Sequence, residues 1–107
     1  HSGSLKAAIK AVEVVDKEMQ RLVPFLHEKG FNIVVTADHG NCDIMKYEDG
    51  TDHASHTKNL VPCVVLPHND QKISLREQGT LADVAPTILT LMRLEIPDEM
   101  TGKNLVQ

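Results

Sequence analysis

The sequence predicts an α/β fold with a mostly parallel sheet, and three features of the chain support that prediction. Residues 31–35, Phe-Asn-Ile-Val-Val, form a short apolar run that is typical of a strand buried on both faces. A second short apolar run lies within residues 61–67, bracketed by Pro62 and Pro67. A long stretch with helical periodicity precedes the first run, as in the βαβ units of α/β proteins. The 107 residues are enough for one small domain with a modest core.

The predicted N-terminal helix starts at Leu5 and leads into the strand predicted after Gly30. Ser4 is a suitable N-cap, and Gly30 supplies a stop signal. Pro24 interrupts the pattern, and because it removes the hydrogen bond to Gln20 we expect it to kink or split the helix. The apolar stripe consists of Leu5, Ala8, Ile9, Val12, Val15, Met19, Leu22, Val23 and Leu26.

The remaining elements are shorter. Residues 41–59 are polar and predict a long loop with a turn at 48–52 and room for a short hairpin. Residues 73–78 predict either an edge strand or an irregular connection. Residues 80–83 form a capping-box pattern that starts a helix ending near Arg93, with Pro86 in its first turn. We expect the core side of this helix to consist of Leu81, Val84, Ile88, Leu89, Leu91 and Met92.

Composition excludes several classes of function. The net charge of −4, the scattered lysines and the 3% aromatic content argue against a nucleic-acid partner. The apolar runs are far shorter than the roughly 20 residues of a membrane-spanning helix. No secretory signal is visible, and Cys42 and Cys63 are expected to be reduced thiols, although a disulfide between them is possible. These features favour a cytoplasmic protein.

The first strand leads into the most informative stretch of the chain, Thr36-Ala37-Asp38-His39-Gly40-Asn41. Asp38 and His39 therefore lie at the carboxyl end of a strand, where open α/β sheets place their sites. His56 follows 17 residues later on a loop that could converge with them. Carboxylate and imidazole together suit Zn, Mn, Co or Fe better than Ca or Mg. The alternative is a polar surface loop in which His39 bonds only to its neighbours.

Other polar residues of this region are weaker candidates. His53 is less suited than His56 as a ligand, and we expect it, with Asn41, to support the loop. Cys42 could act as a nucleophile with a histidine base, but an incidental small residue is the simpler reading. The chain has no Gly-x-Ser-x-Gly motif of a serine hydrolase.

Five segments in the same order resemble the cofactor-independent phosphoglycerate mutases of the alkaline phosphatase superfamily. They are residues 1–13, 36–41, 56–62, 81–89 and 100–105, and they extend over nearly the whole chain. The resemblance implies that His1 is native sequence rather than an expression scar. It also implies that residues 1–107 are the C-terminal part of a three-layer α/β/α phosphatase-like domain.

The resemblance further implies a metal-dependent reaction. The family interconverts 3-phosphoglycerate and 2-phosphoglycerate through a phosphoserine at a site with two divalent metals, usually Mn, with Co, Zn or Fe as substitutes. Asp38 and His39 would bind the metal that activates the serine, and His1 and His56 would bind the other. Imidazole must be neutral to bind a metal, so we expect metal binding to weaken below roughly pH 6.

Part of that site has no counterpart in the sequence. None of the serines (Ser2, Ser4, Ser55, Ser74) has the motif of the phosphorylated serine, and the arginines form no cluster. The resemblance places one metal-binding aspartate four residues before His1. It places the phosphorylated serine, its neighbouring aspartate ligand and the substrate-binding arginines further upstream, so we expect this chain alone to be inactive. Two alternatives remain open. One is another metalloenzyme of the superfamily, such as a phosphopentomutase, phosphatase or sulfatase; the other is a non-catalytic metal-binding fragment that self-associates through an exposed sheet edge.

Overall fold

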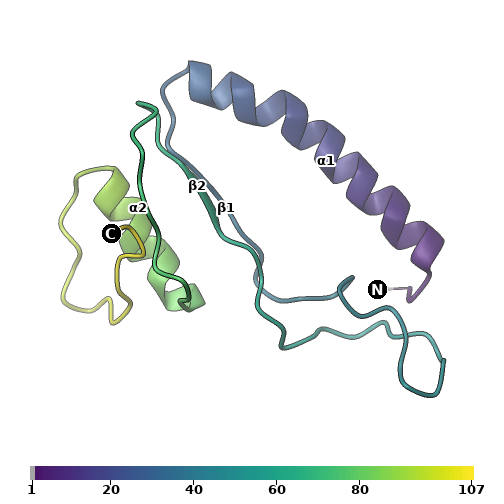
Figure 1. Ribbon diagram of the computed structural model, residues 1–107. Helices are drawn as coiled ribbons and strands as arrows, with labels where there is room; N and C mark the ends of the chain where they lie inside the picture. Colours follow the sequence, from purple (N-terminus) through teal and green to yellow (C-terminus); the bar gives the residue numbers. More distant parts are fainter. Residues whose placement is uncertain (1) are drawn as a thin grey trace. The chain divides into compact units, whose positions relative to one another are not determined.

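The computed structural model describes residues 2–107 and confirms a chain that combines helices and strands, as in α/β proteins (Figure 1). The elements in order are α1 (Leu5–Glu28), β1 (Ile33–Val35), β2 (Val64–Leu66), one turn of 3₁₀ helix (Leu81–Asp83) and α2 (Val84–Leu91). Contacts divide the chain into two compact units. The first runs up to Phe25 and includes Val35–Val64, and the second comprises Leu26–Val34 and Val65–Gln107. No helix of residues 2–107 has the length and apolar character needed to cross a bilayer.

Helix α1 starts at Leu5 as predicted, and its last residue, Glu28, precedes the predicted stop at Gly30. The Ala7 N–H donates to Ser4 Oγ at 3.4 Å, and Gly30, with φ of +81°, follows the last turn. The expectation of a split at Pro24 is wrong, because the helix continues to Glu28 (Figure 1). Pro24 stands just over one turn before the end of the helix. It removes only its own backbone hydrogen bond, and the backbone hydrogen bonds of the residues after it continue the helix to Glu28.

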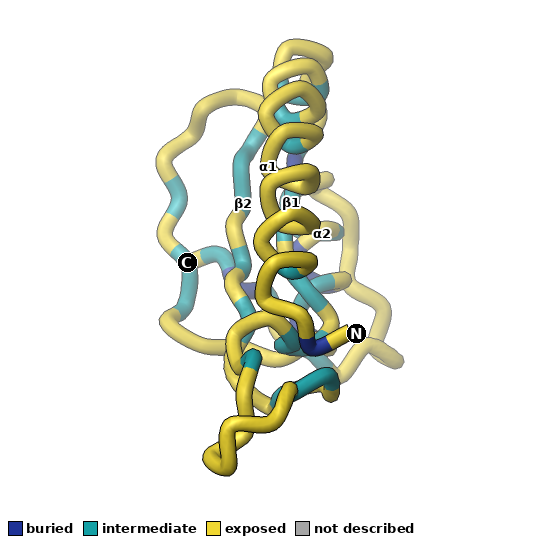
Figure 2. The backbone as a smooth tube through the Cα atoms, turned by 90° about the vertical axis from the view of Figure 1, so that its right-hand side faces the viewer, coloured by how far each residue is buried: buried dark blue, intermediate teal, exposed yellow. Residues whose placement is uncertain are grey.

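The apolar stripe of α1 is exposed at about half of its positions and only half-buried at the others. None of the residues of α1 is buried, and Figure 2 shows the helix as exposed or intermediate along its length. The side chains most typical of a packed face, among them Leu5, Ile9, Val12 and Val15, are each more than half accessible to solvent. Sequence periodicity therefore predicted the helix correctly, but residues 2–107 cover its apolar face only in part.

Strands β1 and β2 are shorter than the apolar runs that predict them, and they pair in an antiparallel two-stranded sheet. Ile33 is buried, whereas Val34 and Val35 are only partly covered. Within residues 2–107 there is thus no parallel pair of strands and no strand buried on both faces. An apolar run indicates burial but not strand direction. The parallel direction was predicted from the βαβ layout, in which a strand before α1 would pair with β1.

The loop at residues 41–59 contains the short hairpin that the sequence allows. Lys46 and Asp52 form an antiparallel bridge and an ion pair, and the His53 N–H donates to the Met45 carbonyl at 3.0 Å. Gly50 occupies the turn with φ of +82°, a conformation in which glycine has no steric penalty. This hairpin gives a defined backbone to a stretch that has no apolar periodicity.

The start of α2 also follows the prediction. The Thr80 N–H donates to Asp83 Oδ2 at 2.8 Å, which forms the capping box, and Pro86 lies in the first helical turn. Arg93 then adopts φ of +59°, and the Leu94 N–H donates back to the Leu89 carbonyl at 2.9 Å. This left-handed residue ends the helix at Leu91, slightly before the predicted end.

The predicted core side of α2 is wrong in part, since Leu81, Ile88 and Met92 are exposed. The buried residues of this helix are Pro86 and Thr87. Their side is covered by the C-terminal tail: Thr87 Oγ1 donates to the Asp83 carbonyl at 2.7 Å and accepts the Leu105 N–H at 2.9 Å. Leu105 is itself buried, so the core of this unit forms between α2 and the tail.

Asp83 joins the helix cap to the same tail. Its carboxylate is buried, and Oδ1 accepts the Lys103 N–H at 2.7 Å while Oδ2 accepts the Thr80 N–H. The Lys103 and Thr80 backbone donors, with a smaller effect from the Arg76 guanidinium, hold the pKa of Asp83 below its usual range. The segment at 73–78, predicted as an edge strand or a connection, is irregular apart from an antiparallel bridge between Leu75 and Val106.

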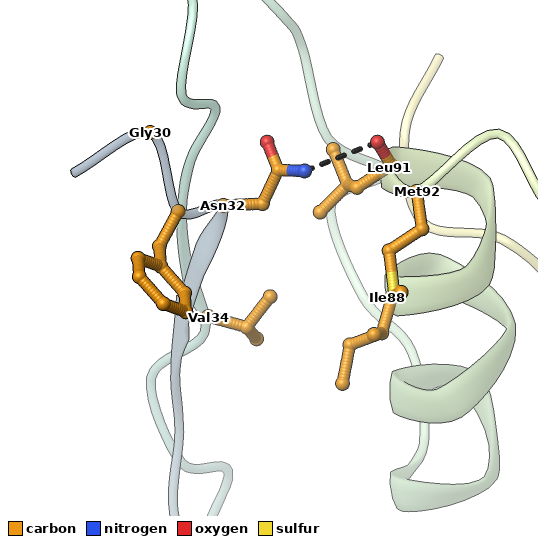
Figure 3. Close-up of a pocket in the computed structure, with 7 residues that line it drawn as sticks. Gly30, Asn32, Val34, Ile88, Leu91 and Met92 are labelled. Atoms are coloured by element: carbon orange, nitrogen blue, oxygen red, sulfur yellow. Dashed lines mark hydrogen bonds between the residues drawn. The ribbon is translucent and has the colours of Figure 1, made fainter. Parts of the chain in front are cut away.

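The second unit also has a pocket of about 360 Å³ (Figure 3). Figure 3 shows Val34 of β1 facing Ile88 of α2, with the Asn32 side-chain amide donating to the Leu91 carbonyl at 3.1 Å. The lining is mostly apolar and contains no titratable side chain. It therefore offers no acid or base for catalysis.

Candidate metal centre

Asp38 and His39 lie three and four residues beyond the end of β1, as the sequence predicts, and both belong to the first unit. The Asp38 side chain is 83% exposed and the His39 side chain 32% exposed. Asp38 Oδ2 and His39 Nε2 are 3.5 Å apart. Two ligand atoms bound at about 2.0–2.2 Å from one metal are separated by roughly 3 to 3.5 Å, so this pair fits a shared ion.

The second ring nitrogen of His39 determines which atom can bind. His39 Nδ1 lies 3.1 Å from the Gly40 carbonyl oxygen. A carbonyl oxygen can only accept, so this hydrogen bond requires the proton on Nδ1. In the neutral ring, Nε2 then keeps its lone pair, and Nε2 is the atom that faces Asp38. Metal-binding histidines in proteins usually have this arrangement, with the non-ligating nitrogen bonded to a backbone carbonyl or carboxylate.

His56 stacks on His39. The ring centroids are 3.6 Å apart and the ring planes are inclined by only 18°. The lone pair of an imidazole lies in the plane of its ring, and two nearly parallel planes at this spacing do not converge on one nearby point. The stack therefore suits two imidazoles that bind different ions better than two that share one.

A backbone contact holds the two histidine segments together. The Thr57 N–H donates to the Gly40 carbonyl at 2.8 Å, and the two residues form an antiparallel bridge. The same carbonyl oxygen is the acceptor for His39 Nδ1. One atom thus fixes the orientation of the His39 ring and the position of the residue next to His56.

Asp43 adds a second connection, which the sequence does not reveal. Its carboxylate accepts the Thr57 hydroxyl, at 3.1 Å to Oδ1 and 2.9 Å to Oδ2, and the Asn59 side-chain amide at 2.5 Å. Hydrogen bonding to Asn59, with a smaller effect from Thr57, lowers the pKa of Asp43. In the sequence Asp43 is one polar residue among many, and no periodicity links it to residues 57 and 59.

The supporting residues predicted from sequence lie near this cluster along the chain. Asn41 Oδ1 accepts a weak hydrogen bond from Cys42 Sγ at 3.6 Å, and both cysteines are free thiols. His53 lies on the second arm of the hairpin, with its ring tilted against Tyr47 at a centroid distance of 4.6 Å. Its buried Nδ1 has no hydrogen-bond partner among the residues that the structure describes.

The structure therefore brings Asp38, His39 and His56 side by side, while the predicted ligand His1 lies outside the described residues. Among residues 2–107, no three His, Cys, Asp or Glu side chains form a group that could hold one metal ion. The arrangement inferred from the resemblance requires only two ligands per metal from this chain. The donor types and the Asp38–His39 separation fit that arrangement.

Comparison with known proteins identifies the family. Residues 1–96 match the family model described as the metalloenzyme superfamily. The chain is also similar over its length to proteins named 2,3-bisphosphoglycerate-independent phosphoglycerate mutase. It is 45% identical to the one from Prochlorococcus marinus in an alignment of 114 positions that covers 100% of this chain and 21% of the relative.

Two further relatives with the same name give the same picture. The chain is 52% identical to the protein of Roseobacter denitrificans, covering 99% of this chain and 21% of the relative. It is 50% identical to that of Rhodopirellula baltica, covering 100% of this chain and 20% of the relative. The chain thus spans about one fifth of the length of the curated relatives that it matches. On the family match over residues 1–96, the chain belongs to the metalloenzyme superfamily.

Proposed function

We propose that this chain supplies half of a two-metal phosphoryl-transfer site in a cofactor-independent phosphoglycerate mutase. In this proposal, residues 1–107 are the C-terminal part of a phosphatase-like domain, a three-layer α/β/α structure with a mostly parallel sheet. The complete enzyme interconverts 3-phosphoglycerate and 2-phosphoglycerate, a step of glycolysis, in the cytoplasm. Similarity along the whole chain to proteins named as such mutases supports this assignment.

The observation on which the proposal chiefly rests is the geometry of Asp38, His39 and His56. Nε2 of His39 is available for a ligand and lies 3.5 Å from Asp38 Oδ2, while the His56 ring stacks against His39. We assign Asp38 and His39 to one metal, and His56 with His1 to the other. Mn is the proposed metal, and Co, Zn or Fe would suit the same donors.

The roles of the chain's own residues follow from this assignment. When bound, two divalent ions lower the barrier to phosphoryl transfer by activating a nucleophilic oxygen and by neutralising charge on the transferred group. The Gly40 carbonyl keeps the proton of His39 on Nδ1, so that Nε2 points its lone pair toward the ligand position. The exposed Asp38 carboxylate remains accessible to a second group that completes the site.

The nucleophilic serine, the remaining carboxylate ligands and the arginines that bind phosphoglycerate would come from the rest of the enzyme. We therefore expect the 107-residue chain alone to have no mutase activity. Turnover of 3-phosphoglycerate by the purified chain would contradict this part of the proposal.

A second candidate function is favoured by the exposed apolar face of α1. Leu5, Ile9 and Val12 are more than half exposed, and exposed apolar stripes promote association. A non-catalytic fragment that binds metal and self-associates, also through its sheet edge, would use this surface. Light scattering at several concentrations separates the two readings of the isolated chain, since association would raise its mass above 11.8 kDa.

A chimeric enzyme tests the catalytic proposal. The matching fifth of the Roseobacter denitrificans protein is replaced by this chain, and interconversion of the two phosphoglycerates is assayed together with bound metal. We expect an active chimera whose activity and metal content fall on Asp38→Ala and on His56→Ala. A chimera that keeps full activity with either substitution would refute the assignment of that ligand. Sequencing upstream of residue 1 addresses the substrate, because a phosphopentomutase or phosphatase would have different substrate-binding residues.

A further inference from the structure

We propose that Asp43 is a positioning residue that sets the separation of His39 and His56. The inference rests on the proposed metal site, since its purpose is to hold two metal-binding imidazoles in a fixed arrangement. It extends that proposal to a residue outside the proposed ligand set. The contacts that carry it all lie within the first unit.

The first step is the link from Asp43 to the His56 segment. Both carboxylate oxygens lie within 3.1 Å of the Thr57 hydroxyl, and Oδ2 also accepts the Asn59 side-chain amide. Two residues that follow His56 are therefore bonded to one side chain that follows His39. Asp43 is 14 and 16 residues away from them in sequence, so the contact connects opposite ends of the loop.

The second step is the link from Thr57 to His39. The Thr57 N–H donates to the Gly40 carbonyl, and that carbonyl is the acceptor of His39 Nδ1. Thr57 thus contacts the His39 segment twice, through its N–H to Gly40 and through its hydroxyl to Asp43. These two bonds restrain the backbone and the side chain of Thr57, and we infer that they hold the adjacent His56 in register against His39.

The packing at Gly40 provides an independent observation. A Cβ at this position would lie 2.1 Å from Thr57 Oγ1 and 2.8 Å from Asp43 Oδ1. The Asp43–Thr57 pair therefore packs directly against the backbone that follows His39, with no space for a side chain. This close approach explains why the two segments need glycine at residue 40.

Asp43 is better suited to positioning than to metal binding. Its Oδ1 accepts from the Thr57 hydroxyl and its Oδ2 accepts from both Thr57 and Asn59, so the carboxylate is oriented toward the segment after His56. Among residues 2–107, Asp43 also belongs to no group of three side chains that could hold a metal ion. Partners of this kind, which orient the ligands rather than touch the metal, commonly change metal affinity by about 10- to 100-fold when they are removed.

The test compares Asp43→Asn, Asp43→Ala and Asp43→Glu in the 107-residue chain, with Asp98→Asn as the matched control. Asp98→Asn makes the same chemical change at an exposed position in the second unit. The first measurement is the NMR shift of the His39 and His56 ring protons without metal, because stacked rings shift each other's resonances. The second is Zn²⁺ affinity by calorimetry, and far-UV circular dichroism monitors the fold.

We expect Asp43→Ala and Asp43→Asn to move both histidine resonances and to weaken Zn²⁺ binding by about 10-fold or more. Asp43→Glu should restore part of the affinity, and Asp98→Asn should change neither measurement. Unchanged ring resonances and unchanged affinity in Asp43→Ala would overturn the inference while leaving the metal site intact. Absence of Zn²⁺ binding by the unsubstituted chain would instead overturn the proposed metal site, and the ring resonances would still decide the role of Asp43.

Discussion

The backbone N–H of Thr57 donates to the carbonyl oxygen of Gly40 at 2.8 Å, and this contact joins the two segments that carry the candidate ligands. The substitution Gly40→Ala tests whether this contact determines the geometry of the two histidines. Its Cβ would lie 2.1 Å from Thr57 Oγ1 and 2.8 Å from Asp43 Oδ1, so the Thr57 and Asp43 side chains beside this contact must shift. Because overpacking of this kind typically costs about 1–3 kcal/mol, we expect a lower free energy of unfolding and loss of the His39–His56 stack.

Urea unfolding and the ring-proton resonances of the two histidines check this prediction. Gly50→Ala serves as the control, since a Cβ there would meet nothing within 4 Å although its φ of +82° adds backbone strain. Gly50→Ala should lower stability and leave the stack unchanged. A Gly40→Ala chain with an unchanged histidine stack would show that the Gly40–Thr57 contact does not set the ring geometry.

Thr87→Val tests the attachment of the C-terminal tail. Thr87 is fully buried, and its hydroxyl accepts the Leu105 N–H while donating to the Asp83 carbonyl. Valine has nearly the same shape but leaves these backbone groups without their partner, which costs about 1–3 kcal/mol. Urea unfolding should show this loss. Thr87→Ser keeps the hydroxyl and both of its hydrogen bonds, so it should be more stable than Thr87→Val. A Thr87→Val chain as stable as the unsubstituted chain would show that the hydroxyl does not hold the tail.

Asp83 should make stability depend on pH. Its pKa is lower in the folded chain than in the unfolded chain, so its ionised form stabilises the fold. That stabilisation is complete above the unfolded carboxyl pKa of about 3.9 and is lost as the pH falls through the lower folded value. We therefore expect Asp83→Asn to destabilise the chain more at pH 7 than at pH 2.5.

Unfolding curves at the two pH values measure this difference. Asp43 and Asp49 also have lowered pKa values but are present in both chains, so the comparison isolates Asp83. A destabilisation that is equal at both pH values would show that the Asp83 carboxylate is not selectively stabilised in its charged form.

Arg93→Gly should stabilise the chain. Arg93 has φ of +59° at the end of α2, and a residue with a Cβ in this left-handed conformation costs about 1–2 kcal/mol. Glycine removes that cost but adds flexibility to the unfolded chain, so we expect a net gain of about 1 kcal/mol or less. Thermal unfolding checks the sign of the change. A lower melting temperature would mean that the Arg93 side chain contributes more than its backbone strain costs.

The parts of the fold that depend on local signals could be predicted from the sequence. Helix α1 follows from its periodicity and caps, and α2 follows from the Thr80–Asp83 capping box. The positions of Asp38 and His39 just beyond a strand follow from the apolar run before them. Each of these features needs only neighbouring residues, so a single sequence contains the information.

The parts that depend on distant contacts could not be predicted in the same way. The antiparallel direction of β1 and β2 is not encoded in their apolar residues. The buried side of α2 is decided by Leu105 in the tail rather than by the most apolar face of the helix. Asp43 acts through Thr57 and Asn59, and nothing in the sequence indicates that these three side chains meet.

Zn²⁺ calorimetry on the chain and its Asp38→Ala variant tests the central claim most directly. Cys42→Ser is included as a control for binding by the neighbouring thiol. If Asp38 and His39 share an ion, the unsubstituted chain and Cys42→Ser should bind Zn²⁺ alike, and Asp38→Ala should bind at least about 10-fold more weakly. Failure of the chain to bind Zn²⁺, or binding that is unaffected by Asp38→Ala, would contradict the assignment of this pair as a metal site.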